Sequence, residues 1–184
     1  MRAALIALPL IALPLLLALP ACESTKSPDD DKNVEQGTSI SVNAKSDSGE
    51  DVKITADGDT GKVAVNLPGF DANINLPKVV LKDSNFDLDG VKLYPGAKVS
   101  SINVKADKSD GEDDAHVQIV YTAPAAPKAV RDWFVKAFAD KSVVTKLDGE
   151  SLIGTTRDGT PFTMNFADAK GGSTTGTIVI DDSK

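Results

Sequence analysis

Cysteine, histidine and aromatic residues are scarce in this sequence. Its 184 residues include one cysteine and one histidine, and only 5% of them are aromatic. One cysteine excludes an internal disulfide and any multi-thiolate metal site, and one histidine excludes a site that needs two imidazole ligands. We therefore expect no metal or other cofactor, and a core with few rings to fill it.

Positive charge is scarce as well. The chain has 20 basic and 27 acidic residues, and Arg2 is the only charged residue before residue 22. The remainder therefore has 19 basic residues and a net charge of −8. Nucleic acid phosphates and anionic lipid headgroups both attract basic surfaces. We expect no binding to nucleic acid and no direct docking on anionic headgroups.

A hydrophobic run long enough to span a membrane is missing too. Of residues 1–21, 17 are hydrophobic, and the apolar run covers residues 3–19. A membrane-spanning helix needs about 20 apolar residues. Pro9 and Pro14 also remove backbone donors and kink a helix. A short apolar run after a basic start is typical of a secretory signal peptide, so we expect residues 1–21 to be cleaved.

The only cysteine stands where that segment ends. Leu19-Pro20-Ala21-Cys22 resembles the lipobox of bacterial prolipoproteins. The resemblance implies a diacylglyceryl group on the Cys22 thiol, acylation of the new amino terminus, and a membrane as partner through this anchor. Glu23 follows, whereas inner-membrane lipoproteins of Gram-negative bacteria typically carry Asp there, so the outer membrane is expected. The alternative is a secreted protein with a free Cys22.

Residues 22–37 consist of the anchor residue Cys22 and a stretch with little apolar content. Residues 23–37 hold one aliphatic side chain, Val34, and show no periodicity. Such a stretch cannot bury enough apolar surface to offset the cost of ordering. We expect a disordered tether that reaches about 50 Å at most.

Residues 38–93 alternate apolar and polar side chains with a period of two. Turn-forming stretches separate the runs, so each run predicts a short, half-buried strand. The apolar members are Ile40, Val42, Ala44, Val52, Ile54, Ala56, Val63, Val65, Leu67, Ala72, Ile74 and Leu76. Both an antiparallel meander and a β-solenoid fit this spacing, and we favour the meander because no repeat motif recurs.

Residues 94–184 combine strands with one helix. Val130, Trp133, Phe134, Ala137 and Phe138 have the spacing of one helical stripe. Six alternating runs predict strands around this helix: 98–106, 115–121, 142–146, 151–156, 160–167 and 174–180. The pattern predicts an α+β fold, predominantly β, with a short-strand β meander followed by a small antiparallel sheet that carries one packed amphipathic helix.

Three short motifs of this second half resemble known sequences. They are Tyr94-Pro95-Gly96-Ala97, Tyr121-Thr122-Ala123-Pro124, and Val130 with Trp133-Phe134. The half resembles a small secreted α+β module of bacterial envelope proteins, and the whole chain resembles uncharacterised alphaproteobacterial envelope lipoproteins. The resemblance implies fold and location, and it brings no known activity or catalytic residue.

Residues that could carry chemistry are few. Residues 85–90 open like a calcium loop, but Gly96 stands where the bidentate Glu belongs, so we expect a turn there. The acidic loop 107–114 matches no defined ligand spacing. His116 lies on the polar side of its strand. No motif of a serine hydrolase, nucleotide-binding loop or zinc protease is present. We expect no catalytic residue.

Three functions remain open from the sequence. The one that we favour is a non-enzymatic, lipid-anchored envelope protein that faces the periplasm as a binding or assembly subunit. Its contact patch would be the apolar outer sheet face of residues 39–93. The alternative is a carrier that holds a small apolar ligand between helix and sheet, near Trp133, Phe134 and Phe138. A hydrolase that uses an acidic pair or His116 has the least support.

Overall fold

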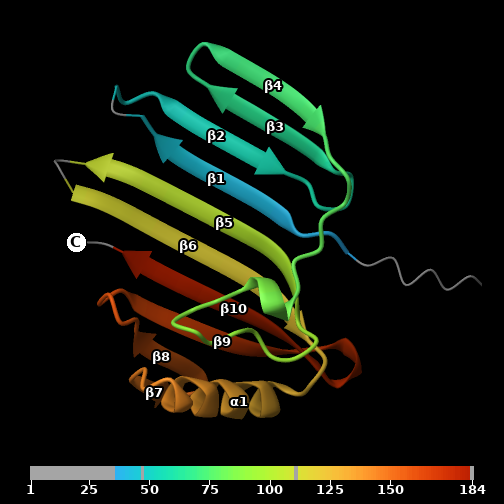
Figure 1. The fold of residues 1–184 in the computed structure, drawn as a ribbon, viewed down its shortest axis with the longest axis vertical. Helices are drawn as coiled ribbons and strands as arrows, with labels where there is room; N and C mark the ends of the chain where they lie inside the picture. Colours follow the sequence, from blue (N-terminus) through green and yellow to red (C-terminus); the bar gives the residue numbers. More distant parts are fainter. Residues whose placement is uncertain (1–35, 47, 110–111, 183–184) are drawn as a thin grey trace, which may run out of the picture. The chain divides into compact units, whose positions relative to one another are not determined.

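Ten strands form one mixed sheet in the computed structural model, which describes residues 36–46, 48–109 and 112–182. Their order across the sheet is β4-β3-β2-β1-β5-β6-β10-β9-β8-β7, and α1 packs at the β7–β10 end (Figure 1). This arrangement confirms the predicted α+β class, predominantly β. The predicted signal peptide, Cys22 and residues 22–35 of the tether lie outside the described residues.

The first four strands form an antiparallel meander, as the sequence pattern predicts. Each strand pairs with the next through a short turn, which is the pairing that alternating strands with intervening Gly and Asp favour. The strands are β1 (Ser39–Lys45), β2 (Asp51–Ala56), β3 (Lys62–Leu67) and β4 (Phe70–Asn75). The solenoid alternative is therefore wrong.

The meander joins the second half through a parallel pair that the sequence does not predict. Strand β1 pairs in parallel with β5 (Lys98–Ser109), so that Ile40 lies beside Ile102 and Val42 beside Val104. Parallel neighbours need a long connection, which β2 to β4 and residues 76–97 provide. The pairing unites the predicted meander and the predicted second sheet into one sheet.

The remaining strands are antiparallel to their neighbours. They are β6 (Glu112–Ala123), β7 (Thr145–Asp148), β8 (Ser151–Thr155), β9 (Pro161–Ala169) and β10 (Ser173–Asp182), with a short 3-10 turn η2 (Lys170–Gly172) before β10. Strand β7 begins three residues later than the pattern predicts, because Ser142 has a positive φ of 60° and interrupts the extended chain.

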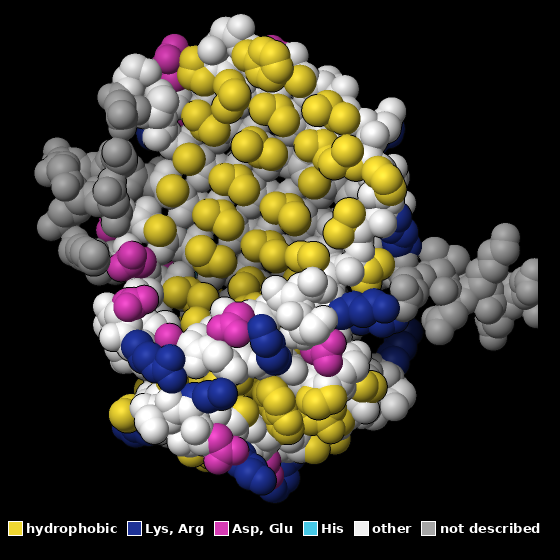
Figure 2. Space-filling view, in the orientation of Figure 1, with side chains coloured by type: hydrophobic (Ala, Val, Ile, Leu, Met, Phe, Trp, Pro, Cys, Tyr) yellow, Lys and Arg dark blue, Asp and Glu magenta, His cyan; other side chains and the backbone are white. Residues whose placement is uncertain are grey.

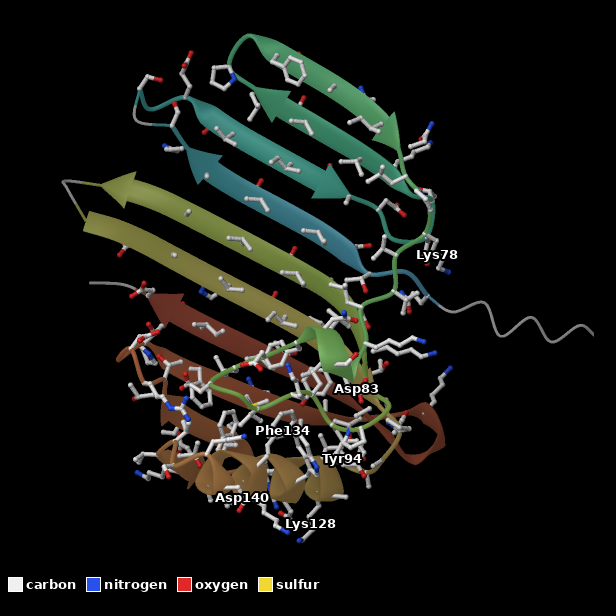
Figure 3. All side chains as sticks on the ribbon, viewed as in Figure 1. Lys78, Asp83, Tyr94, Lys128, Phe134 and Asp140 are labelled. Carbon is white, nitrogen blue, oxygen red and sulfur yellow. The ribbon has the colours of Figure 1, made fainter. Side chains whose placement is uncertain are left out.

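Helix α1 (Pro127–Asp140) has the predicted apolar stripe. It begins at Pro127, whose fixed φ suits the first turn, after Ala126 in an extended conformation. Val130, Phe134 and Phe138 are buried against the sheet. Figure 3 shows Phe134 between the helix and the strands. No helix among the described residues has both the length and the apolar character that crossing a membrane requires.

Aromatic rings fill the layer between α1 and the sheet. The ring of Phe134 meets that of Tyr121 edge to face at 6.1 Å, and Phe138 packs on Phe162 at 5.1 Å. Tyr121 extends over Gly176, where an added Cβ would lie 2.0 Å from the tyrosine ring. A glycine is therefore needed at that position of β10.

Residues 76–97 form a second cover beside the helix. This segment includes the 3-10 turn η1 (Asp83–Asn85) and buries Leu88, Val91 and Leu93 in the core. The Thr38 hydroxyl ties the segment to the sheet: it donates to the Val99 carbonyl at 2.6 Å and accepts from the Leu81 amide at 2.9 Å. The cover is fixed where β1 begins.

Phe134→Ala should lower the free energy of unfolding by about 3–5 kcal/mol, because it removes a fully buried ring and leaves a cavity. Thermal or denaturant unfolding of the purified protein measures this change. Lys136→Ala, on the exposed side of the same helix, should change stability by less than about 0.5 kcal/mol. Equal effects of the two substitutions would show that the helix does not carry the core.

Candidate interaction surface

One face of the sheet is largely apolar from β4 across to β8. Strand register decides which side chains share that face, because side chains one position apart point to opposite sides. In β1 to β5 each strand contributes three such side chains: Ile40, Val42, Ala44, Val52, Ile54, Ala56, Val63, Val65, Leu67, Phe70, Ala72, Ile74, Ile102, Val104 and Ala106. The face continues through Val117 and Ile119 of β6 to β10 and β9.

The described residues cover only half of this face. Helix α1 and residues 76–97 lie over the half formed by β6 to β10, and every buried hydrophobic residue of the described chain lies between Leu88 and Ile178. Strands β1 to β4 contribute none of them. Their apolar side chains are half-buried by strand neighbours alone or are exposed. We call the fifteen side chains of β1 to β5 named above the bare face.

The bare face is a continuous hydrophobic area. Figure 2 shows hydrophobic side chains over β1 to β5 and on into β6, bordered by charged side chains where α1 and residues 76–97 begin to cover the sheet. Phe70 keeps 55% of its surface exposed and Ile74 keeps 49%. Soluble monomers rarely expose contiguous apolar areas beyond a few hundred Å², and larger ones mark interaction sites. The bare face is the strongest candidate for a functional surface on the described residues.

The opposite face of the same strands is polar. Side chains that alternate with the bare face are Ser41, Asn43, Lys53, Asn66, Asn73 and Asn103. An antiparallel sheet commonly has one face in water and one face packed. The polar face therefore needs no covering layer. The alternation of side chains identifies the bare face as the side that needs one.

His116 lies on the polar face, as the strand pattern predicts. Its Nδ1 is hydrogen-bonded to the Asp181 carboxylate on the neighbouring strand β10, and Lys105 is its register partner on β5. The His116–Asp181 pair was not predicted, because a cross-strand partner depends on a register that no local motif encodes. Both side chains are about half exposed. No serine, threonine or cysteine is in register with His116 on either neighbouring strand, so this pair has no nucleophile there.

The acidic candidates form turns where they are described. Asp87 accepts hydrogen bonds from the Lys92 ammonium at 2.9 Å and the Gly90 amide at 2.7 Å. The Lys92 contact, with the Gly90 amide, holds the pKa of Asp87 below its usual value. No cluster of three potential metal ligands occurs among the described residues. The centre of the acidic loop, residues 110–111, lies outside them.

Tyr121 is the buried titratable group of the core. Burial raises the pKa of its phenol, so the hydroxyl stays protonated at neutral pH. It lies between Phe134 and Gly176 and makes no hydrogen bond within the described chain. A neutral phenol enclosed in this way is a packing group, since no substrate can reach it without moving α1.

Trp133, Phe134 and Phe138 do not enclose a cavity where the structure describes them. Phe134 and Phe138 are fully buried and touch other rings on both sides. Trp133 packs on Tyr94 at the rim of the helix. The adjoining hollow of about 380 Å³ is lined by Gly90, Val91, Lys92, Trp133, Lys136, Ala137, Asp140 and Lys141. It lies outside the ring layer of Phe134 and Phe138, and four of its eight lining residues are charged, so it is not the cavity predicted between helix and sheet.

Comparison with protein-family models, with curated proteins and with solved structures finds no match to this chain.

Proposed function

We propose that this chain is a non-enzymatic, lipid-anchored envelope protein that faces the periplasm and works as a binding or assembly subunit. The observation that carries the proposal is the bare face: the described residues supply a second layer for half of one apolar sheet face and none for the other half. A sheet that is hydrophobic on one face is stable when another layer buries it. In this proposal a partner supplies that layer.

Partner binding would gain from burial of aliphatic side chains. Complete burial of a Val or Ile side chain contributes about 1.5–3 kcal/mol, and the residues of the bare face start half-buried or exposed. Only part of that gain becomes affinity, because association also costs translational and rotational freedom. A contact of moderate strength is therefore expected.

The anchor would place the bare face near its partner. In the proposal Cys22 carries the lipid, and residues 22–37 hold the sheet within about 50 Å of the outer membrane. One acyl chain binds a membrane only marginally, and several together bind it stably. An anchored protein meets other envelope proteins at a high local concentration, so a moderate contact would suffice.

The carrier alternative has weaker support. A ligand between α1 and the sheet would have to displace Phe134 or Phe138, both fully buried among other rings. Removal of such a ring from its contacts costs several kcal/mol. The hydrolase alternative would need a base and a nucleophile together, and the exposed His116–Asp181 pair provides only the base and its orienting group.

Cys22→Ser should abolish membrane association and leave an unprocessed precursor, because the hydroxyl is a far weaker nucleophile than the thiol that takes up the diacylglyceryl group. Fractionation of cells and the mass of the protein measure both effects. A mutant that still fractionates with the outer membrane at the processed mass would contradict the lipid anchor.

Val65→Lys should release the protein from its assembly, because it places a charge on the bare face in the middle of β3. Native gels of gently extracted membranes measure the assembly size. Asn66→Lys adds the same charge one position along β3 on the polar face and should leave that size unchanged. Ile74→Lys, at a side chain that is already half exposed, repeats the test with less risk to folding.

The same assay separates contact from catalysis. His116→Ala should keep the assembly size, and the wild-type protein should hydrolyse no ester, peptide, phosphate or glycoside substrate. Loss of a measurable activity with His116→Ala, together with unchanged assembly in Val65→Lys and Ile74→Lys, would favour an enzyme and reject the contact function.

A further inference from the structure

We propose that the layer covering the bare face is the bare face of a second copy of this chain. The two sheets would pack face to face about a two-fold axis, so that β1 to β5 of both copies form a sandwich. This inference rests on the proposed contact function and names its partner. The area, the chemistry and the side-chain sizes of the bare face carry it.

The chemistry of the bare face is self-complementary. Within the paired segments, β1 to β4 and residues 101–106 of β5, all fifteen side chains on this side of the sheet are aliphatic or aromatic. A two-fold interface brings the same patch together from both copies, so it has to match itself. A uniform apolar face meets this condition in many orientations. It has no charge pattern of the kind that selects a charged foreign partner.

The area is sufficient for a dimer. Five strands spaced about 4.8 Å apart, each six residues long at about 3.3 Å per residue, give a footprint of roughly 480 Å². Two copies would bury roughly 1,000 Å² if the face is treated as flat, and protruding side chains add to this area. A specific interface needs about 1,000 Å² in total. The bare face therefore reaches this lower limit without help from other surfaces.

The side-chain sizes suit sheet-on-sheet packing. Two sheets in a sandwich pack about 10 Å apart, with the inner side chains interdigitated. Strands β2, β1 and β5 of the bare face carry only Ala, Val and Ile. The larger Leu67 and Phe70 pair at the β3–β4 turn, at the border of the sheet. Small side chains in the centre allow the close approach that two facing sheets require.

The acidic charge of the chain is compatible with this pairing. The excess of 27 acidic over 20 basic residues lies outside the bare face. Two copies therefore repel one another only through charges that are not in the interface. Salt screens that repulsion within about 10 Å at 0.1 M. The dimer should therefore be retained at high salt, whereas a contact made by opposite charges would weaken.

Crosslinking of the full chain in intact cells tests the inference. Ile54→Cys and Val65→Cys place a thiol on the bare face, while Lys53→Cys and Asn66→Cys place one on the polar face of the same strands. Each of the four is a separate variant. A short bis-maleimide reagent should link two copies of either bare-face variant into a species of twice the monomer mass, and it should leave both polar-face variants monomeric. Two differently tagged copies, expressed together, should appear in the same band. The wild-type chain, whose only cysteine is Cys22, gives the background.

Each outcome decides a different point. Twice the monomer mass with both tags, from the bare face alone, supports the second copy. A product of another mass from the bare face rejects the second copy and leaves the contact function standing. Monomer from all four variants, or equal dimer from both faces, rejects the second copy as well. If the native assembly size of the wild type is also that of a monomer, the contact function fails with it.

Discussion

An apolar sheet face in water needs a second layer, and within the described residues this chain supplies one for only half of its sheet. Helix α1 and residues 76–97 bury the half formed by β6 to β10, where Phe134 and Phe138 meet the rings of Tyr121 and Phe162. Strands β1 to β4 of the other half keep the same alternation of side chains but contribute no buried hydrophobic residue. Both the stability of this half and its proposed role depend on what covers it.

Local patterns predicted much of this fold. The period of two in residues 39–76 predicted the four strands of the meander, and the stripe from Val130 to Phe138 predicted α1. Each of these depends on residues within one short segment. The same alternation predicted that Val63 and Val65 share an apolar face.

Long-range pairing set the limit of that prediction. The parallel pairing of β1 with β5 joins segments about 60 residues apart, and several strands of this chain have an apolar period that would match β1 equally well. The contact between His116 and Asp181 follows from the β6–β10 register in the same way. The sequence also could not show which strands α1 covers, because that depends on the order of strands in the sheet.

The two faces of the sheet divide the possible functions between them. The polar face carries His116, Asp181 and Lys105, which are exposed or half-exposed and hold no nucleophile in register. The bare face carries no titratable group in β1 to β4 or in residues 101–106 of β5. Chemistry would have to use the polar face and contact would use the bare one, so substitutions at neighbouring positions of one strand separate the two.

Amide hydrogen exchange of the protein in envelope membranes tests the dependence on a cover most directly. Strands β2 to β4 have no core of their own, so their protection should come from the layer that a partner adds. We expect slow exchange in these strands of the wild type and clearly faster exchange in Val65→Lys, with β9 and β10 unchanged between the two. Equal exchange of β2 to β4 in both proteins would show that the bare face has no cover and would contradict the account.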